Sequence, residues 1–125
     1  MIYGIGIDMV RVRRIQGAVE KWGERFLQRI FTGDEIAYCY ARKNPYLPLS
    51  ARFAAKEAFI KAAGSRIGVT FSDIEVTNND AGQPFLRLKG TLQEFLRKNS
   101  IAKVHLSLSH EQEYAVACVV LERHS

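Results

Sequence analysis

The 125-residue sequence contains few cysteines and prolines and no long hydrophobic run. No stretch is long enough to span a membrane, and we expect no signal peptide, because the first residues have the pattern of a strand and arginines follow them. The two cysteines, Cys39 and Cys118, show neither metal-ligand nor redox spacing, which favours free thiols in a reducing cytoplasm. Repeats, low-complexity tracts and linkers are also absent, so residues 1–125 are expected to form a single domain.

What the sequence does contain is apolar material and an excess of positive charge. Hydrophobic residues make up 47% of the chain, which is enough for a domain of this length to bury a core. The formal net charge of +5 favours anionic partners, although by itself it does not say which.

Hydrophobic periodicity and turn signals divide the chain into short strands and helices. A threonine followed three residues later by glutamate, at Thr32, predicts a capped helix start. The expected elements are a strand at 2–10, basic helical segments within 12–30 that break near Gly23, a helix at 32–42, a long helix at 49–64, strands at 71–76 and 85–89, a helix at 91–99, and a hairpin of strands at 103–109 and 114–122. This order predicts an α+β domain in which a small, mostly antiparallel sheet packs against the long central helix.

The first strand carries its carboxylate on a face that has no other side chains. Because side chains alternate along a strand, Gly4, Gly6 and Asp8 share one face, whereas the large apolar residues between them share the other. Glycine inside a strand marks a bulge or a close approach by a ligand or another backbone. One structural explanation is that the glycines admit a tightly packed, alanine-rich helix, and the long helix is an obvious candidate.

The long helix carries Glu57 where a core helix is usually apolar. On a helical wheel, alanines lie on one side of Glu57, and Phe53 and Ile60 lie on the other, so its carboxylate should be at least half desolvated. Such an acid needs a cation or a hydrogen-bond donor to compensate. The cation is either Lys61, one turn on, in an intrahelical ion pair, or a metal ion that leaves Lys61 free for chemistry.

The glycine face and the buried acid are related. A helix packed on the glycine face would bring Glu57 toward Asp8, and two converging carboxylates repel each other unless a proton or a divalent cation joins them. A few hard oxygen ligands with room for water suit Mg²⁺ completed by substrate phosphates.

Three segments, taken in order, resemble a known family. They are Gly4-Ile5-Gly6-Ile7-Asp8 near the N-terminus, Arg52-Phe53-Ala54-Ala55-Lys56-Glu57-Ala58 with Lys61-Ala62 in the middle, and Leu106-Ser107-Leu108-Ser109-His110 with Tyr114-Ala115-Val116-Ala117 near the C-terminus. In this order and spacing they are similar to the holo-acyl-carrier-protein synthase group of 4′-phosphopantetheinyl transferases. The resemblance covers essentially the whole chain.

The resemblance implies an enzyme and a reaction. Such an enzyme transfers the 4′-phosphopantetheine arm of coenzyme A to a serine of apo acyl carrier protein and releases adenosine 3′,5′-bisphosphate. By position, Asp8 and Glu57 match the family's Mg²⁺ ligands, and the metal would also hold the coenzyme pyrophosphate. In this phosphoryl transfer, Glu57 would take the serine proton directly or through metal-bound water, and Lys61 would neutralise or protonate the leaving phosphate.

The family pattern also implies contacts to coenzyme A. The matching residues are Arg42, Lys43, Arg52, Gly64 with the loop 64–68 that it begins, and His110. Each has a structural alternative: a solvated cation in a loop or at a helix end, a helix C-cap, or a solvated histidine in a hairpin turn. Relatives often carry asparagine and a basic residue in the turn before Pro84, whereas this chain has Ala81 and Gln83, so no contact is carried over to that turn.

The resemblance further implies two kinds of protein partner. Arg14, Lys21 and Arg25 form a stripe on the first helix that would dock an acidic acyl carrier protein and deliver its serine near Asp8. The alternative for this stripe is the solvated face of a basic protein. The family is also trimeric, which predicts a homotrimer with sites between neighbouring subunits.

Other functions fit the sequence less well. A small basic nucleic-acid-binding module would interleave aromatic and basic residues on an exposed strand face, but these strands are rich in small aliphatic residues and the tyrosines cluster on a helix. A dinucleotide-binding enzyme would need a third glycine after Gly4 and Gly6. A non-catalytic scaffold would not need Asp8, Glu57 and Lys61 together. We therefore expect neither nucleic acid nor a membrane among the partners.

Overall fold

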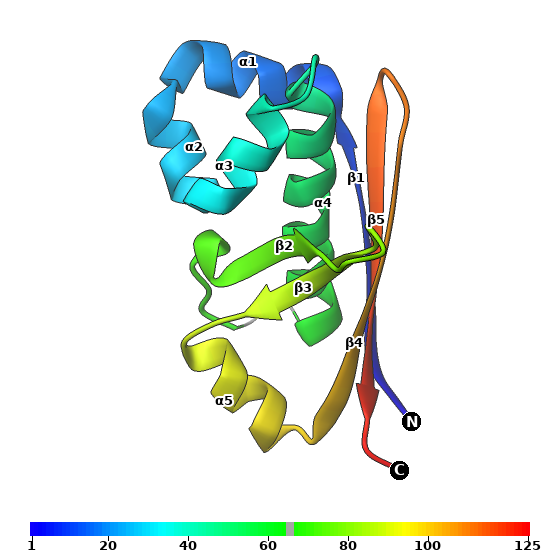
Figure 1. Ribbon diagram of the computed structural model, residues 1–125. Coiled ribbons are helices and arrows are strands. Elements are labelled where there is room, and N and C mark those ends of the chain that lie inside the picture. Colours follow the sequence, from blue (N-terminus) through cyan, green and yellow to red (C-terminus); the bar gives the residue numbers. More distant parts are fainter. Residues whose placement is uncertain (65–66) are drawn as a thin grey trace.

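A long central helix packs between two antiparallel sheets in the computed structural model, which describes residues 1–64 and 67–125 (Figure 1). In chain order the elements are β1 (Ile2–Arg11), α1 (Val12–Trp22), α2 (Glu24–Ile30), α3 (Gly33–Tyr40), α4 (Tyr46–Ala63), the 3₁₀ turn η1 (Phe71–Asp73), β2 (Ile74–Asn78), β3 (Pro84–Leu88), α5 (Thr91–Lys98), β4 (Ile101–His110) and β5 (Tyr114–Arg123). Strands β1, β5 and β4 form one sheet in that order, and β2 and β3 form a separate hairpin.

The predicted α+β class is confirmed, but three details differ. The chain builds two sheets rather than one. Helix α4 begins at Tyr46, a turn earlier than expected, because Pro45 and Pro48 lie at its start, where the first N–H groups have no helical partner to lose. The segment expected to be a strand from residue 71 first makes a 3₁₀ turn, and the strand starts at Ile74.

The glycine face of β1 receives the backbone of α4, as the sequence predicted. A Cβ atom on Gly4 would lie 2.0 Å from the carbonyl oxygen of Ala62, and one on Gly6 would lie 1.9 Å from that of Ala58. Both distances are far inside van der Waals contact, so no side chain fits at either position. Glycine is therefore what allows the helix to lie directly on the strand, beside Asp8.

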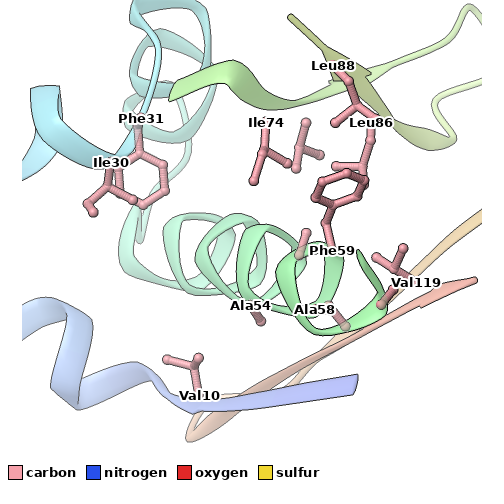
Figure 2. Packing of buried hydrophobic residues seen from close by; sticks show 14 of the residues in the cluster. Val10, Ile30, Phe31, Ala54, Ala58, Phe59, Ile74, Leu86, Leu88 and Val119 are labelled. Carbon is pink, nitrogen blue, oxygen red and sulfur yellow. The ribbon is translucent and has the colours of Figure 1, made fainter. Parts of the chain in front are cut away.

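The hydrophobic core lies on two sides of α4 (Figure 2). Ala54 and Ala58 of α4 face the large sheet, where Val10 and Val119 are buried, and Phe59 faces the small hairpin. Because it is covered on both sides, α4 is apolar over most of its circumference. Even so, no helix in the described part of the chain has the length and apolar character needed to cross a membrane.

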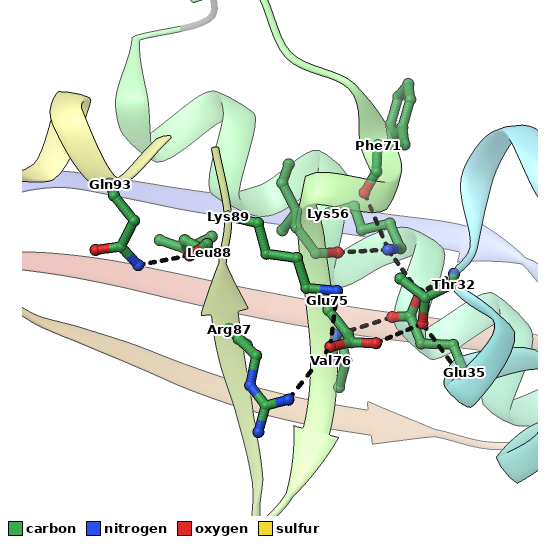
Figure 3. A network of polar contacts seen from close by, with 11 residues as sticks. Thr32, Glu35, Lys56, Phe71, Glu75, Val76, Arg87, Leu88, Lys89 and Gln93 are labelled. Atoms are coloured by element: carbon green, nitrogen blue, oxygen red, sulfur yellow. Dashed lines mark hydrogen bonds and ion pairs between the residues drawn. The ribbon is translucent and has the colours of Figure 1, made fainter. Parts of the chain in front are cut away.

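A buried ion pair joins α3, α4 and β2 (Figure 3). The predicted capping box is present, and its Glu35 carboxylate accepts the N–H of Thr32 at 2.9 Å, the ammonium of Lys56 at 2.8 Å and the N–H of Val76 at 2.8 Å. Lys56 also donates to two backbone carbonyls in residues 71–74. A buried pair of this kind is tolerated because both charges are fully hydrogen-bonded.

Candidate active site

The first half of the site is an acid–lysine cluster made of Asp8, Glu57 and Lys61. The ammonium of Lys61, on α4, donates to Asp8 Oδ1 at 2.9 Å and to the carbonyl oxygen of Ile7 at 3.0 Å. Lys61 thus forms its ion pair with the strand rather than with Glu57, so the intrahelical pair considered from the sequence is wrong. A cation already occupies one side of the Asp8 carboxylate.

Electrostatics places Glu57 within reach of Asp8. Burial raises the pKa of Glu57, and the negative charge of Asp8 raises this pKa further, whereas Lys61 and Arg14 lower it in part. The negative charge of Asp8 thus acts on Glu57, which is the direction of effect that a helix packed on the glycine face leads one to expect. The described residues include no group of three or more acidic, histidine or cysteine side chains that could hold a metal ion by themselves.

The second half of the site is an arginine pocket of about 470 Å³, where α3, the start of α4, the β2–β3 hairpin and the end of β4 meet. The polar residues that line it include Tyr38, Arg42, Lys43, Arg52, Asn78 and His110. The pocket thus brings together four of the five positions assigned to coenzyme A from the sequence. The fifth, Gly64, lies elsewhere.

Gly64 ends α4 in the left-handed conformation, with φ of 109°, as its C-cap role predicts. It is twelve residues beyond Arg52 on the same helix, or about 18 Å along the axis, and so lies near the acid–lysine cluster's end of α4. Ser65 and Arg66 of the loop 64–68, which the family pattern assigns to coenzyme A, lie outside the described residues.

Arg52 is the most enclosed cation of the pocket. Only 5% of it is exposed, which excludes the solvated helix-end arginine considered from the sequence. Its guanidinium lies 4.1 Å from the ring centroid of Tyr38, and Nη2 donates to Asn78 Oδ1 at 3.2 Å. Its Nε is buried without a hydrogen-bond partner in the described structure, which costs free energy.

The basic residues assigned to the carrier protein do not lie on one helix. Arg14 and Lys21 are exposed on α1, but Arg25 lies on α2, beyond a sharp bend at Gly23 with φ of 57° and ψ of −135°. The single stripe expected from their spacing is therefore wrong in detail. Arg14 is the member that reaches the site, because its charge lowers the pKa of Glu57.

Sequence reasoning missed Tyr38 and Asn78. Tyr38 stands four residues before Arg42, a spacing at which helix side chains meet, so this contact could have been predicted from the sequence. Asn78 had none, because it is 26 residues from Arg52 and contacts it through the tertiary fold. Its amide also donates to the carbonyl oxygen of Gly82, which ties the β2–β3 turn to the pocket.

Comparison with known proteins identifies the family. The profile of the 4′-phosphopantetheinyl transferase superfamily matches residues 4–119. The chain belongs to this family. Holo-[acyl-carrier-protein] synthase of Halothermothrix orenii is 48% identical over 98% of both chains. The solved synthase of Neisseria meningitidis superposes with a TM-score of 0.91 at 38% identity, covering 98% of this chain and all of that one.

A second solved relative of this transferase contains a ligand. The Bacillus anthracis synthase, solved in complex with CoA (3′,5′-ADP), superposes with a TM-score of 0.80 at 41% identity over 99% of both chains. The family, the enzyme class and the α+β fold expected from the sequence are thus confirmed. Holo-[acyl-carrier-protein] synthases generally use a divalent metal ion.

Proposed function

We infer that this transferase moves the 4′-phosphopantetheine group of coenzyme A to a serine hydroxyl of an apo acyl carrier protein. The products are the holo carrier protein and adenosine 3′,5′-bisphosphate. The observation that carries this inference is the convergence of Asp8, Glu57 and Lys61 on the glycine face of β1, in a chain whose full-length relatives are holo-acyl-carrier-protein synthases.

We assign Mg²⁺ as the metal and Asp8 and Glu57 as the residues that would hold it. Two partly desolvated carboxylates that repel each other are a favourable site for a divalent cation with oxygen ligands. When bound, the metal would neutralise charge on the coenzyme pyrophosphate and orient it. The remaining chemistry belongs to the side chains of the chain.

Glu57 and Lys61 divide the proton transfers between them. The carboxylate of Glu57 accepts the proton of the serine hydroxyl, directly or through a water molecule. Lys61 is half-exposed on a flexible stem, so its ammonium can leave Asp8 Oδ1 and neutralise or protonate the departing phosphate. Both residues lie one turn apart on α4, so Glu57 would serve the entering serine while the long side chain of Lys61 reaches the oxygen that leaves on the opposite side of the phosphorus.

The arginine pocket supplies the coenzyme-binding half. Arg42, Lys43, Arg52 and His110 gather donors around a cavity large enough for a nucleotide. Arg52 is buried and its Nε has no hydrogen-bond partner in the described part of the chain. An anionic ligand would therefore offset part of the free-energy cost of burying this charge.

The two halves of the site lie on different sides of α4. Arg52 contacts α3 and β2, whereas Glu57 faces β1 and the start of α1, and the helix itself is about 10 Å thick. A site shared between neighbouring subunits would let one copy contribute its arginine pocket and the next its acid–lysine cluster. This geometry supports the homotrimer with intersubunit sites implied by the family.

An exposed apolar face supports the same assembly. The face of the large sheet opposite α4 is not covered by any element of the described chain (Figure 1). On it, Ile5, Ile7 and Met9 are 62%, 61% and 65% exposed, and they are paired in register with Val120, Cys118 and Val116 of β5. A contiguous apolar patch of this kind is typical of a subunit interface.

Replacing Ile7 with glutamate tests the interface. We expect Ile7→Glu to dissociate the oligomer in light scattering and to remove activity, because a charge is placed in the centre of the patch. Tyr40→Glu changes an exposed apolar residue of α3 and serves as the control that leaves the mass unchanged. A wild-type chain that is monomeric would contradict the proposal.

The remaining partners and the compartment follow from the same reaction. The carrier protein is acidic and docks at Arg14, with Lys21 and Arg25 as outlying contacts. We place the reaction in the cytoplasm, where the free thiols of Cys39 and Cys118 would stay reduced.

Mass spectrometry of an apo carrier protein tests the function directly. After incubation with the transferase, coenzyme A and Mg²⁺, the carrier should gain the mass of one phosphopantetheine group. A chelator should prevent the gain, and excess Mg²⁺ should restore it. An unmodified carrier in the complete mixture would contradict the reaction, and modification that persists in the chelator would contradict the metal.

A further inference from the structure

The ring of Tyr38 holds two arginines of the pocket. The guanidinium carbon of Arg42 lies 4.3 Å from the ring centroid, and that of Arg52 lies 4.1 Å from it. Both distances are within the range of favourable cation–π contacts. Tyr38 belongs to α3, Arg42 follows that helix, and Arg52 belongs to α4, so one ring connects two walls of the pocket.

The two arginines have no acidic partner in the described part of the chain. Neither forms an ion pair with a carboxylate there, and Arg52 is buried with its Nε unpartnered. Two like charges held on one ring repel each other, and burial increases the cost. Negative charge from outside the chain would therefore compensate the buried charge of Arg52.

We propose that Tyr38 is a positioning residue that orders Arg42 and Arg52 for the 3′-phosphate of coenzyme A and so makes the enzyme selective for the 3′-phosphorylated coenzyme. The inference rests on the proposed function, which supplies the coenzyme. A phosphate monoester carries nearly two negative charges and therefore suits a pocket whose two walls each present a guanidinium group held by the same ring. The coenzyme's pyrophosphate is the group assigned to the metal.

Preorganisation is the physical basis of the effect. A free arginine side chain loses rotamer entropy, up to about 2 kcal/mol, when it is ordered around a ligand. A ring that stacks on both guanidinium groups removes part of this cost before the ligand binds. Arg52 is also held by Asn78, which is itself bonded to Gly82, whereas Arg42 is exposed. Truncating Tyr38 should therefore act mainly through Arg42.

Calorimetric binding of two nucleotides tests this role without turnover. We expect Tyr38→Leu to weaken adenosine 3′,5′-bisphosphate roughly three- to tenfold and to leave adenosine 5′-monophosphate, which lacks the 3′-phosphate, within about twofold. Tyr38→Phe keeps the ring and should restore wild-type affinity. Tyr40→Leu is the matched control, because Tyr40 lies on the same helix but lines a different pocket.

A double-mutant cycle locates the effect. Once Arg42 is changed to glutamine, replacing Tyr38 should cost little further affinity, because the ring then has one guanidinium fewer to order. In steady-state assays, Tyr38→Leu should raise KM for coenzyme A and leave kcat unchanged, which a general loss of structure would not do.

Several outcomes would overturn the assignment. Equal weakening of both nucleotides would make the ring a simple wall of the pocket, and a Phe variant as weak as the Leu variant would mean that the hydroxyl contacts the ligand. If Tyr38→Leu melts below the assay temperature, Tyr38→Gln carries the same expectation. Wild-type protein that binds neither nucleotide would refute the proposed function as well, whereas tight wild-type binding with an unaffected Leu variant would refute the role of Tyr38 alone.

Discussion

The acid–lysine cluster and the arginine pocket are held in place by different means. In the cluster, the backbone of α4 rests on the backbone of β1 at Gly4 and Gly6, and this contact sets Glu57 against Asp8. In the pocket, side chains hold side chains: Tyr38 stacks on its arginines and Asn78 bonds one of them. Backbone contact gives little freedom, as suits catalytic groups, while stacked side chains can adjust to a ligand.

Filling the glycine face is the most severe test of whether backbone contact holds the acid–lysine cluster in place. Gly6→Ala should reduce the free energy of unfolding by more than about 3 kcal/mol, because its Cβ would lie 1.9 Å from a helix carbonyl that cannot move away. Gly17→Ala on α1 is the control, because a Cβ there meets nothing within 4 Å. This variant should raise the free energy of unfolding by as much as about 1 kcal/mol. Urea unfolding measures both. Equal stability of the two variants would contradict the close approach.

Removing a carboxylate should stop the chemistry and leave the fold intact. Asp8→Asn should lower turnover about a thousandfold, because the metal loses a charged ligand while the backbone contact remains. Glu57→Gln should behave similarly, with the base removed as well. Initial rates and circular dichroism check this, and Glu94→Gln on α5 is the control. A loss smaller than tenfold would remove Asp8 from the mechanism.

Charge reversal at Arg14 separates the partners of the two regions. Arg14→Glu should raise KM for the carrier protein about tenfold and change KM for coenzyme A little, because the residue lies beside the cluster and not in the pocket. Arg13→Glu, an adjacent exposed position on α1, is the control. Equal changes in both Michaelis constants would contradict the docking assignment.

The smallest effect concerns acid stability of the polar network beside the pocket (Figure 3). Burial raises the pKa of Glu75, but hydrogen bonds from Thr32 and Lys89 and the charges of Lys89 and Arg87 lower it below its usual 4.5. The ionised carboxylate therefore stabilises the fold above pH 4.5, and this contribution is lost as the pH falls through the lower folded pKa.

The corresponding variant gives the measurement. Glu75→Gln should be less stable than wild type by about 1 kcal/mol at pH 7, and the difference should disappear in acid. Thermal unfolding across this pH range checks the sign. A difference that stays constant with pH would show that Glu75 contributes through packing alone.

The features that could be predicted from the sequence are those set by local patterns, and the features that could not are contacts between side chains far apart in the chain. The glycine face and the capping box at Thr32 were predicted because each is a short pattern with one physical cause, whereas Glu57 is only partly buried. The pairing of Lys56 with Glu35 was missed, since the residues are 21 positions apart and neither lies in a local motif that requires the other. The same holds for Asn78 and Arg52.

The sequence by itself determined the family, the order of the elements and the residue types of the acid–lysine cluster, because periodicity and short-range steric rules act along the chain. Tertiary structure alone decided which cation Asp8 pairs with, that Arg52 is buried against Tyr38, and that no element of residues 1–64 and 67–125 covers the apolar face of β1. These outcomes depend on which distant segments pack together. That choice is made by the summed burial of the whole core, and no local pattern records it.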